Sequence, residues 1–247
     1  MSIETPADLE GLSRVGQITR QTLDALEDNV RAGVSTEELD DVAAAVLARH
    51  GARSAPALVY GFPKTVLISV NDEIVHGIPG PRRLRRGDLV KLDVTIEKDG
   101  YVADAARTVI VESAADVGRR LAACARAAFD AAVAVARAGT RVNQIGLAIQ
   151  REVRQHGFAV VHGLTGHGVG RTIHEEPMVP NRYDPWQRDV LTAGLVLTIE
   201  PMISAGSPEA VQDRNGWTIR TRDGSLSAHH EHTLVMTRER PLILTAA

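Results

Sequence analysis

An internal repeat restricts the fold of this chain more than any other feature of its sequence. Arg-Ala-Gly occurs at Arg31–Gly33 and recurs 106 positions later at Arg137–Gly139. Each copy precedes a stretch with apolar residues at helical spacing, and these stretches end on His50–Gly51 and His156–Gly157. A glycine after the last turn is a typical helix stop. Because both ends of the motif keep the same offset, we expect one structural unit to occur twice; chance similarity between two amphipathic helices is the alternative.

The segments around each copy indicate which elements the unit contains. A helical stretch precedes each copy, at about 14–31 and about 119–137, and short β-branched runs follow. These runs are Thr65–Val70, Leu89–Ile96, Val102–Val111, Val160–Leu164, Leu195–Ile199, Trp217–Thr221 and Thr233–Thr237. We therefore predict an α+β fold in a single domain, residues 1–247, with pseudo-symmetric halves at about 10–112 and about 115–240. Each half should pack a pair of helices on an antiparallel sheet, with a cleft between the halves.

Composition excludes several classes of protein. The 44% hydrophobic content is enough for a sizeable core, and the net charge of −3 gives no basic surface for a specific nucleic acid or an anionic membrane. No apolar run is long enough to cross a bilayer, and the polar start does not resemble a secretory leader. The single cysteine, Cys124, fits a reducing compartment. We expect a cytoplasmic, monomeric protein.

Two acidic residues occupy positions in predicted strands. Asp99–Gly100 separates two β-type runs and is a hairpin signal. With these as the central turn residues, Thr95 lies opposite Asp104, and Asp93 becomes the diagonal neighbour of Asp104 on the same face. Two such carboxylates repel unless a cation lies between them. They are candidate metal ligands, and an ordinary surface hairpin is the alternative.

The second half contributes further candidate ligands. Three glycines surround His167 in Gly166–Arg171, which favours close approach of the backbone to a ligand. Glu200 interrupts an apolar run just before Pro201 and is expected at a strand end or bulge, and Glu231 precedes another apolar run. A buried carboxylate needs a partner, which is a metal in one interpretation and an arginine in the other.

Together these motifs resemble the methionine aminopeptidase family, type I, over nearly the whole chain. The matching segments are Gly61–Lys64, Ser69–Pro79, the Asp93 to Asp104 hairpin, Gly166–Arg171, His174–Pro177, Thr198–Met202, Trp217, Ser227–Ala228 and Glu231–Thr233. The resemblance implies the pseudo-twofold pita-bread fold of these metallopeptidases. Type I is indicated because a long helical insertion would separate the last two glutamates in type II, whereas only 30 residues lie between Glu200 and Glu231 here.

The family's metal ligands map onto five residues, Asp93, Asp104, His167, Glu200 and Glu231. The resemblance implies two divalent ions, which Asp104 and Glu231 bridge. His167 and Glu200 complete one ion's ligands, and Asp93 completes those of the other. Carboxylate and imidazole ligands accept cobalt, manganese, iron or zinc. A water activated between the ions would attack the peptide carbonyl.

The resemblance also implies catalytic and substrate-binding residues. His174 would stabilise the developing oxyanion, Glu200 would move a proton, and His76 would contact the substrate near the scissile amide. The expected reaction is removal of the initiator methionine from peptides and nascent proteins, preferably when the second residue is small and uncharged. The expected substrate-binding residues are His76, His174, Phe62, Leu67, Trp217 and Ile173.

Departures from the family gather around the methionine side-chain pocket. Leu58–Gly61 replaces an aromatic-histidine-glycine run, Leu67 stands where cysteine is common, and Ile173 stands where an aromatic residue is frequent. His229–His230 replaces a glutamine and an aromatic residue. A further metal site at His229, His230 and His232 is not expected, because strand alternation would divide these residues between two faces.

Two other functions stay open at this point. The first is an X-Pro aminopeptidase or prolidase, although those enzymes carry an additional N-terminal domain. The second is a non-catalytic pita-bread protein that binds RNA or the ribosome, although such proteins usually lose the metal ligands. Arg82–Arg86 is expected to be a solvated loop, with transient ribosome contact as the alternative.

Overall fold

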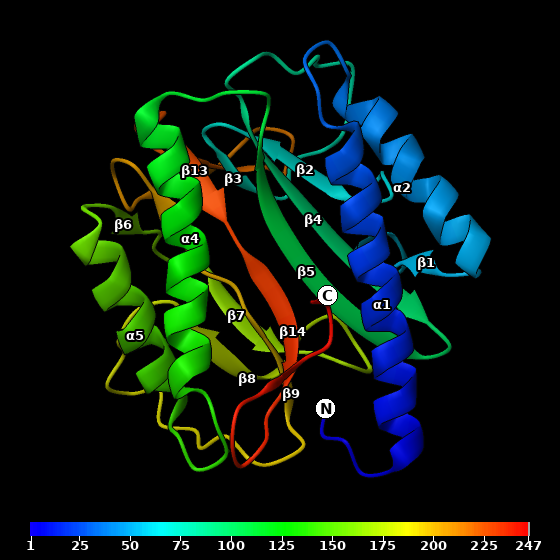
Figure 1. Cartoon of the computed structure of the whole chain (residues 1–247), viewed down its shortest axis with the longest axis vertical. Helices are drawn as coiled ribbons and strands as arrows, with labels where there is room; N and C mark the ends of the chain where they lie inside the picture. The colour runs from blue at the N-terminus through cyan, green and yellow to red at the C-terminus, as the bar shows by residue number, and fades with distance from the viewer. Residues whose placement is uncertain (247) are drawn as a thin grey trace.

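Four long helices lie on one face of a central sheet in the computed structural model, which describes residues 1–246 (Figure 1). The first pair is α1 (Pro6–Asn29) and α2 (Thr36–His50), and the second is α4 (Asp116–Val135) and α5 (Val142–Gln155). The helices of each pair contact each other, and α1 packs on the central strands. A short helix, α3 (Ala55–Tyr60), follows the first pair. This is the α+β arrangement of helix pairs that the repeat predicted.

The two copies of the repeat share one backbone geometry. Gly33 and Gly139 have φ angles of 90° and 93°, which a residue with a Cβ adopts only at a cost. The N–H of Gly33 donates to the carbonyl of Leu84, and the N–H of Gly139 donates to the carbonyl of Leu191, both at 2.8 Å. The repeat therefore includes matching backbone hydrogen bonds just before α2 and α5 as well as matching residues.

The first helix begins earlier than its apolar spacing predicted. It starts at Pro6 rather than near residue 14, because Thr5 and Asp8 form a capping box. The Thr5 side chain accepts from the Asp8 N–H at 3.2 Å, and the Asp8 carboxylate accepts from the Thr5 N–H at 3.0 Å. The short helix α3 was not predicted, although Ser54 caps its start and Gly61 ends it with a φ of 69°.

The main sheet runs in the order β1-β4-β5-β14-β9-β7-β8, with β2 paired to β4 and β15 paired to β14. Its strands are β1 (Arg53–Ser54), β2 (Leu67–Val70), β4 (Leu89–Lys98), β5 (Tyr101–Ile110), β7 (Thr165–Gly168), β8 (Glu175–Pro180), β9 (Val196–Ile199), β14 (Glu231–Val235) and β15 (Leu242–Ile243). Two small sheets, β13-β10-β6 and β11-β12-β3, lie beside it. Their strands are β3 (Glu73–Val75), β6 (Ala159–Val160), β10 (Met202–Ser204), β11 (Ala210–Gln212), β12 (Ile219–Thr221) and β13 (Ser227–His229). All the recorded pairings between these strands are antiparallel.

Strands β5 and β14 join the two halves at the centre of the molecule (Figure 1). Two threonine hydroxyls bridge the backbone there. Thr233 Oγ1 donates to the carbonyl of Asp104 at 2.8 Å and accepts from its N–H at 2.9 Å. Thr108 Oγ1 donates to the carbonyl of His229 at 2.7 Å and accepts from its N–H at 2.9 Å. These matching bridges make His229 the pseudo-symmetric equivalent of Asp104.

The predicted strands were partly correct. Every predicted β-branched run contains strand residues, although only Val160 of the run Val160–Leu164 belongs to a strand, β6. Strands β7 and β8 were missed, because β7 consists of threonine, two glycines and a histidine, and β8 contains two prolines. Neither strand has the β-branched alternation on which the prediction depended.

Each helix pair covers its own apolar cluster. Leu23, Leu39 and Leu92 belong to the cluster under α1 and α2, and Leu121 and Ile149 belong to the cluster under α4 and α5. Asp93 lies between two residues of the first cluster, Leu92 and Val94, but its own side chain lines the polar cavity described below. Within residues 1–246, no helix is both long and apolar enough to cross a membrane.

Candidate metal centre and adjoining pocket

The hairpin of β4 and β5 has the register that its turn residues predicted. Thr95 pairs with Asp104, and the turn residues Asp99 and Gly100 have φ angles of 52° and 79°. Both positive φ values are those of the tight turn that Asp-Gly favours. Asp93 therefore lies diagonally across from Asp104 on the same face of the sheet, and both side chains line one cavity.

All five residues expected as ligands line this cavity, whose volume is about 270 Å³. They are Asp93 on β4, Asp104 on β5, His167 on β7, Glu200 after β9 and Glu231 at the start of β14. Ligand atoms of Asp104, His167 and Glu231 lie within 4.8 Å of one another. A second group with the same spacing consists of Glu200, His229 and Glu231. The structure thus brings carboxylates from both halves to one point.

The glycines beside His167 serve a different purpose from the one expected. A Cβ on Gly166 would lie 2.7 Å from the carbonyl oxygen of Thr198, and a Cβ on Gly168 would lie 2.2 Å from that of Glu176. These oxygens belong to neighbouring backbone, so the glycines permit close packing of β7 against its neighbours rather than approach to a ligand. They still matter for the site, because they fix the strand that carries His167.

Hydrogen bonds orient the ligands of the second half. His167 Nδ1 lies 3.0 Å from the Gly168 carbonyl oxygen, a pairing that leaves Nε2 free to bind a cation. The His167 N–H donates to Thr198 Oγ1 at 3.1 Å, and that hydroxyl donates to Glu200 Oε1 at 2.7 Å. Asn181 Nδ2 donates to the Glu200 carbonyl at 2.9 Å. Thr198 was not singled out from the sequence, although a polar residue two positions before Glu200 in a buried strand is the signal that marks it.

The electrostatics of the cluster fit a divalent cation. Burial raises the pKa values of Asp93, Glu200 and Glu231 well above their ordinary range and raises the pKa of Asp104 to about 6. Among the described residues no arginine or lysine forms an ion pair with these four carboxylates. Asp104 Oδ1 and Glu231 Oε1 are buried without a hydrogen-bond partner. Four carboxylates with unsatisfied oxygens and one imidazole form a donor set suited to divalent cations.

The two histidines expected to act on the substrate lie at different depths. His76 is half-buried, follows β3 with a φ of 59°, and burial lowers its pKa to about 4. His174 is exposed at the mouth of the cavity, and burial of part of its ring lowers its pKa. Its ring centroid lies 4.3 Å from that of His167. Both rings are therefore neutral near neutral pH and line the same cavity.

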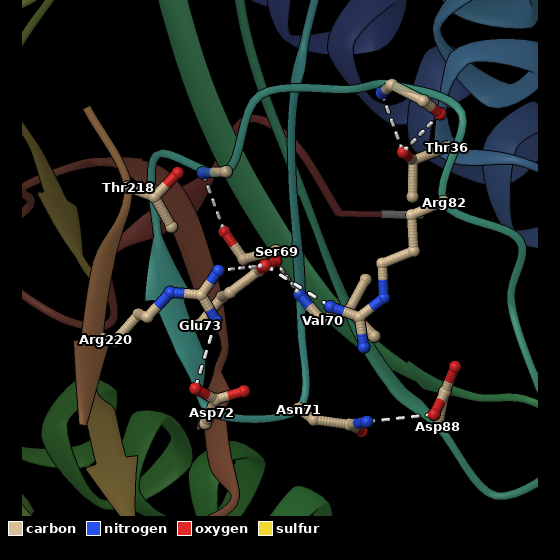
Figure 2. Close-up of polar contacts among 12 residues, drawn as sticks. Thr36, Ser69, Val70, Asn71, Asp72, Glu73, Arg82, Asp88, Thr218 and Arg220 are labelled. Carbon is tan, nitrogen blue, oxygen red and sulfur yellow. Dashed lines mark hydrogen bonds and ion pairs between the residues drawn. The ribbon is translucent and has the colours of Figure 1, made fainter. Parts of the chain in front are cut away.

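A polar network fixes the segment that carries His76 (Figure 2). Figure 2 shows Glu73 between two arginines: Arg220 donates at 2.9 Å and Arg82 at 3.3 Å. Arg220 also donates to Asp72 at 3.1 Å, and Glu73 accepts from the Val70 N–H at 2.7 Å. This network ties β3 from the first half to β12 from the second, next to His76.

The apolar part of the cavity contains the expected pocket residues. The rings of Phe62 and Trp217 meet edge to face with centroids 5.1 Å apart. Leu67 and Ile173 also line the cavity. Sequence reasoning did not assign Pro56, Val75, Leu164 and Met202 to the lining, although Val75 and Met202 lie inside the matched motifs.

The histidines near the end of the chain divide between two faces of the sheet, as strand alternation predicted. His229 points toward Glu200 and Glu231, whereas His230 and His232 pack against Phe129 on α4. No group of three metal-binding side chains forms around His230 and His232 within the described part of the chain.

A cluster of carboxylates and imidazole beside an apolar slot, in a twofold-repeated α+β fold, defines a metallopeptidase. Residues 10–238 match metallopeptidase family M24, and the chain belongs to this family. It is 40% identical to methionine aminopeptidase 2 of Bacillus subtilis, over 99% of both chains. It is also 40% identical to the methionine aminopeptidase of Escherichia coli, over 99% of this chain and 94% of that one. The crystal structure of methionine aminopeptidase from Rickettsia prowazekii covers 100% of both chains with a TM-score of 0.95 and 36% identity. The expected pita-bread fold is thereby confirmed.

Proposed function

We propose that this protein is a methionine aminopeptidase that removes the initiator methionine from peptides and nascent proteins. One observation carries the proposal: the carboxylate cluster and the Phe62–Trp217 slot line the same cavity. The slot suits a flexible thioether side chain, because sulfur makes favourable contacts with aromatic rings. The full-length similarity to methionine aminopeptidases supports the same activity.

Asp93, Asp104, His167, Glu200 and Glu231 would hold two divalent ions. When bound, such ions acidify water and polarise a carbonyl. The close carboxylates, with burial raising their pKa values, support this role, and availability would decide among cobalt, manganese, iron and zinc.

The chain's own residues would complete the catalytic site. Glu200 would hold and release a proton, because its Oε1 already accepts from Thr198 and its pKa is raised by burial. His174 would donate to the substrate's carbonyl oxygen as charge develops there. His76 would hold the scissile amide from the neighbouring wall of the cavity.

The mouth of the cavity would set the preference for the second residue. Tyr60 and His174 line it and form a hydrogen bond with each other, which leaves little room for a bulky residue beyond the scissile bond. A formyl group would remove the basic lone pair of the substrate's amine, so that the carboxylates around Asp93 would no longer attract it. We therefore expect cleavage of peptides with a free methionine followed by a small, uncharged residue.

A peptide panel tests the proposal. The purified protein, loaded with cobalt or manganese, should release methionine from Met-Ala, Met-Gly and Met-Ser and largely spare Met-Leu, Met-Lys and formyl-Met-Ala. Leu-Ala and Ala-Pro peptides control for a general aminopeptidase and for an X-Pro enzyme. Equal kcat/KM for Met-Ala and Met-Leu, or a preference for Leu-Ala or Ala-Pro, would contradict the methionine assignment. Absence of both metal binding and cleavage would favour a non-catalytic binding protein instead.

We further propose that the protein acts in the cytoplasm as a monomer. Three arginines of the Arg82–Arg86 loop form ion pairs: Arg82 with Glu73, Arg83 with Glu38 and Arg86 with Glu112. These ion pairs support a structural role for the loop, and transient contact with the ribosome stays an alternative for that surface.

A further inference from the structure

His229 is a buried polar residue beside two carboxylates of the candidate metal centre, and the proposed mechanism does not use it. Its side chain is 1% exposed, and neither Nδ1 nor Nε2 has a hydrogen-bond partner. Its Nε2 lies 3.6 Å from Glu231 Oε2 and 3.9 Å from Glu200 Oε2. Burying an imidazole with both nitrogens unsatisfied is costly, so this side chain needs an interaction that forms when the site is loaded.

The pseudo-twofold symmetry explains why His229 points into the site. The threonine bridges make His229 equivalent to Asp104. The strand pairing gives the same equivalence, because Asp104 pairs with Thr95 and His229 pairs with Met202. Asp93, two residues before Thr95, then corresponds to Glu200, two residues before Met202. His229 therefore occupies the place in the second half that a proposed ligand occupies in the first.

We propose that His229 is a positioning residue of the metal centre: small shifts in the loaded protein would bring its Nε2–H within hydrogen-bond distance of the carboxylate oxygens that face it, Glu231 Oε2 at 3.6 Å and Glu200 Oε2 at 3.9 Å. This inference rests on the proposed metal-dependent function and deepens it. The hydrogen bond would hold both glutamates in the orientation in which their other oxygens face the ions. It would also satisfy the Nε2 nitrogen in the loaded protein.

A comparison with His167 distinguishes this role from that of a ligand. A metal-binding histidine almost always donates its second ring nitrogen to a protein or water acceptor. His167 has such a partner in the Gly168 carbonyl at 3.0 Å, whereas Nδ1 of His229 has none. If Nε2 of His229 bound a cation, a buried N–H would stay unpaired at Nδ1. If Nε2–H donates to the glutamates, Nδ1 keeps only a lone pair, and no buried N–H of the ring is left unpaired.

Three variants test the proposal through metal binding. His229→Leu removes both nitrogens at similar volume, His229→Gln keeps a donor, and His230→Gln changes the adjacent residue on the opposite face. Calorimetric titration of the metal-free proteins with Co²⁺ should show binding weakened by about 10- to 100-fold in His229→Leu. It should show near wild-type binding in His229→Gln and His230→Gln. Unchanged affinity in His229→Leu, or equal losses in His229→Leu and His229→Gln, would overturn the proposal.

The tautomer of His229 in the wild-type protein gives a test that does not depend on folding of a variant. In the Zn²⁺-loaded protein, nitrogen-15 NMR of the imidazoles should show His229 protonated at Nε2 and His167 protonated at Nδ1. A metal-bound Nε2 with Nδ1–H at His229 would overturn the proposal and make it a ligand. Failure of the wild-type protein to bind Co²⁺ or Zn²⁺ would instead contradict the proposed function, so the two failures are distinguishable.

Discussion

The hydroxyl of Tyr60 lies 2.5 Å from Nδ1 of His174, at the mouth of the cavity. Nδ1 of a neutral imidazole that accepts this bond carries no proton, so the proton rests on Nε2. Burial lowers the pKa of His174, which keeps the ring neutral near neutral pH. We predict that the Tyr60 hydroxyl is the donor in this contact, and that it thereby selects the tautomer in which His174 would offer Nε2–H to a substrate oxygen. Tyr60 belongs to the Leu58–Gly61 departure from the family pattern.

Replacing Tyr60 with phenylalanine should lower kcat and leave metal binding unchanged. Loss of one hydrogen bond of about 1 kcal/mol corresponds to roughly a fivefold slower reaction. Steady-state kinetics on Met-Ala and calorimetric metal titration would measure the two quantities. Tyr183→Phe is the matched control, because Tyr183 is exposed and does not line the cavity. Equal kcat values for Tyr60→Phe and the wild-type protein would exclude a tautomer-selecting role.

Alanine at His76 or His174 should abolish most turnover without loss of metal. Both line the cavity, but neither belongs to the two groups of side chains spaced to bind a cation. Removal of a donor to a developing oxyanion costs about 100- to 1,000-fold in kcat, which sets the expected loss for His174→Ala. Metal stoichiometry by elemental analysis provides the second readout, and Glu200→Ala should lose metal and activity together. A reduced stoichiometry in either histidine variant would reassign that residue as a ligand.

The stability of the metal-free protein should depend on pH through Glu231. Burial raises its pKa well above the ordinary value, so the folded protein retains a proton that the unfolded chain releases. A group of this kind stabilises the fold below its unfolded pKa, and that contribution is lost as the pH rises through the folded pKa. The Tm of the metal-free wild-type protein should therefore fall, relative to that of Glu231→Gln, as the pH rises above the ordinary glutamate pKa of about 4.3 and through the raised pKa of the folded protein.

Thermal melting in the presence of a chelator would measure this difference. Shifted groups outside the carboxylate cluster, such as Lys91 and His76, are present in both proteins and largely cancel in the comparison. A Tm difference that stays constant across the pH range would show that Glu231 is not protonated in the metal-free fold. Added Mn²⁺ should remove the alkaline loss, because it replaces the proton as the partner of the carboxylate.

Arg220→Leu should destabilise the protein and raise the KM for methionine peptides. The arginine is half-buried and holds Asp72 at 3.1 Å and Glu73 at 2.9 Å (Figure 2). It also holds Asp213 at 2.9 Å. After allowance for solvent screening, the loss should be about 1–2 kcal/mol in the free energy of unfolding. Arg83→Ala, which breaks a largely exposed pair with Glu38, is the control and should cost well under that amount. Denaturant titration and steady-state kinetics would decide, and equal effects of the two variants would contradict the anchoring role.

The sequence determined the hairpin register because a two-residue Asp-Gly turn fixes which residues pair. Thr95 faces Asp104 as a direct consequence of Asp99 and Gly100 at the centre of the turn. The helix pair and its repeat were predictable for a similar reason, since both depend on local spacing.

The second half of the site was less predictable, because it depends on distant packing. His167 lies on β7, whose glycines pack closely against the backbone carbonyls of Thr198 and Glu176. The strand lacks the alternation of apolar and polar residues by which a strand is predicted from sequence. The position of His229 likewise depends on which face of β13 meets the site, and the missing partners of its nitrogens are a property of the folded chain. The sequence showed only that a histidine stands where the family usually has glutamine.

The seam between β5 and β14 has a mechanical consequence. Only two residue pairs join these strands, and the two threonine bridges extend the contact by one side chain at each end. Asp104 and Glu231 approach each other across this seam from opposite halves. Any cation held by both would act as a cross-link between the two halves of the repeat. Metal loading should then slow hydrogen exchange along β5 and β14 more than in α2 or α5, and the proposed ions would hold the two halves of the fold together as well as serve the reaction.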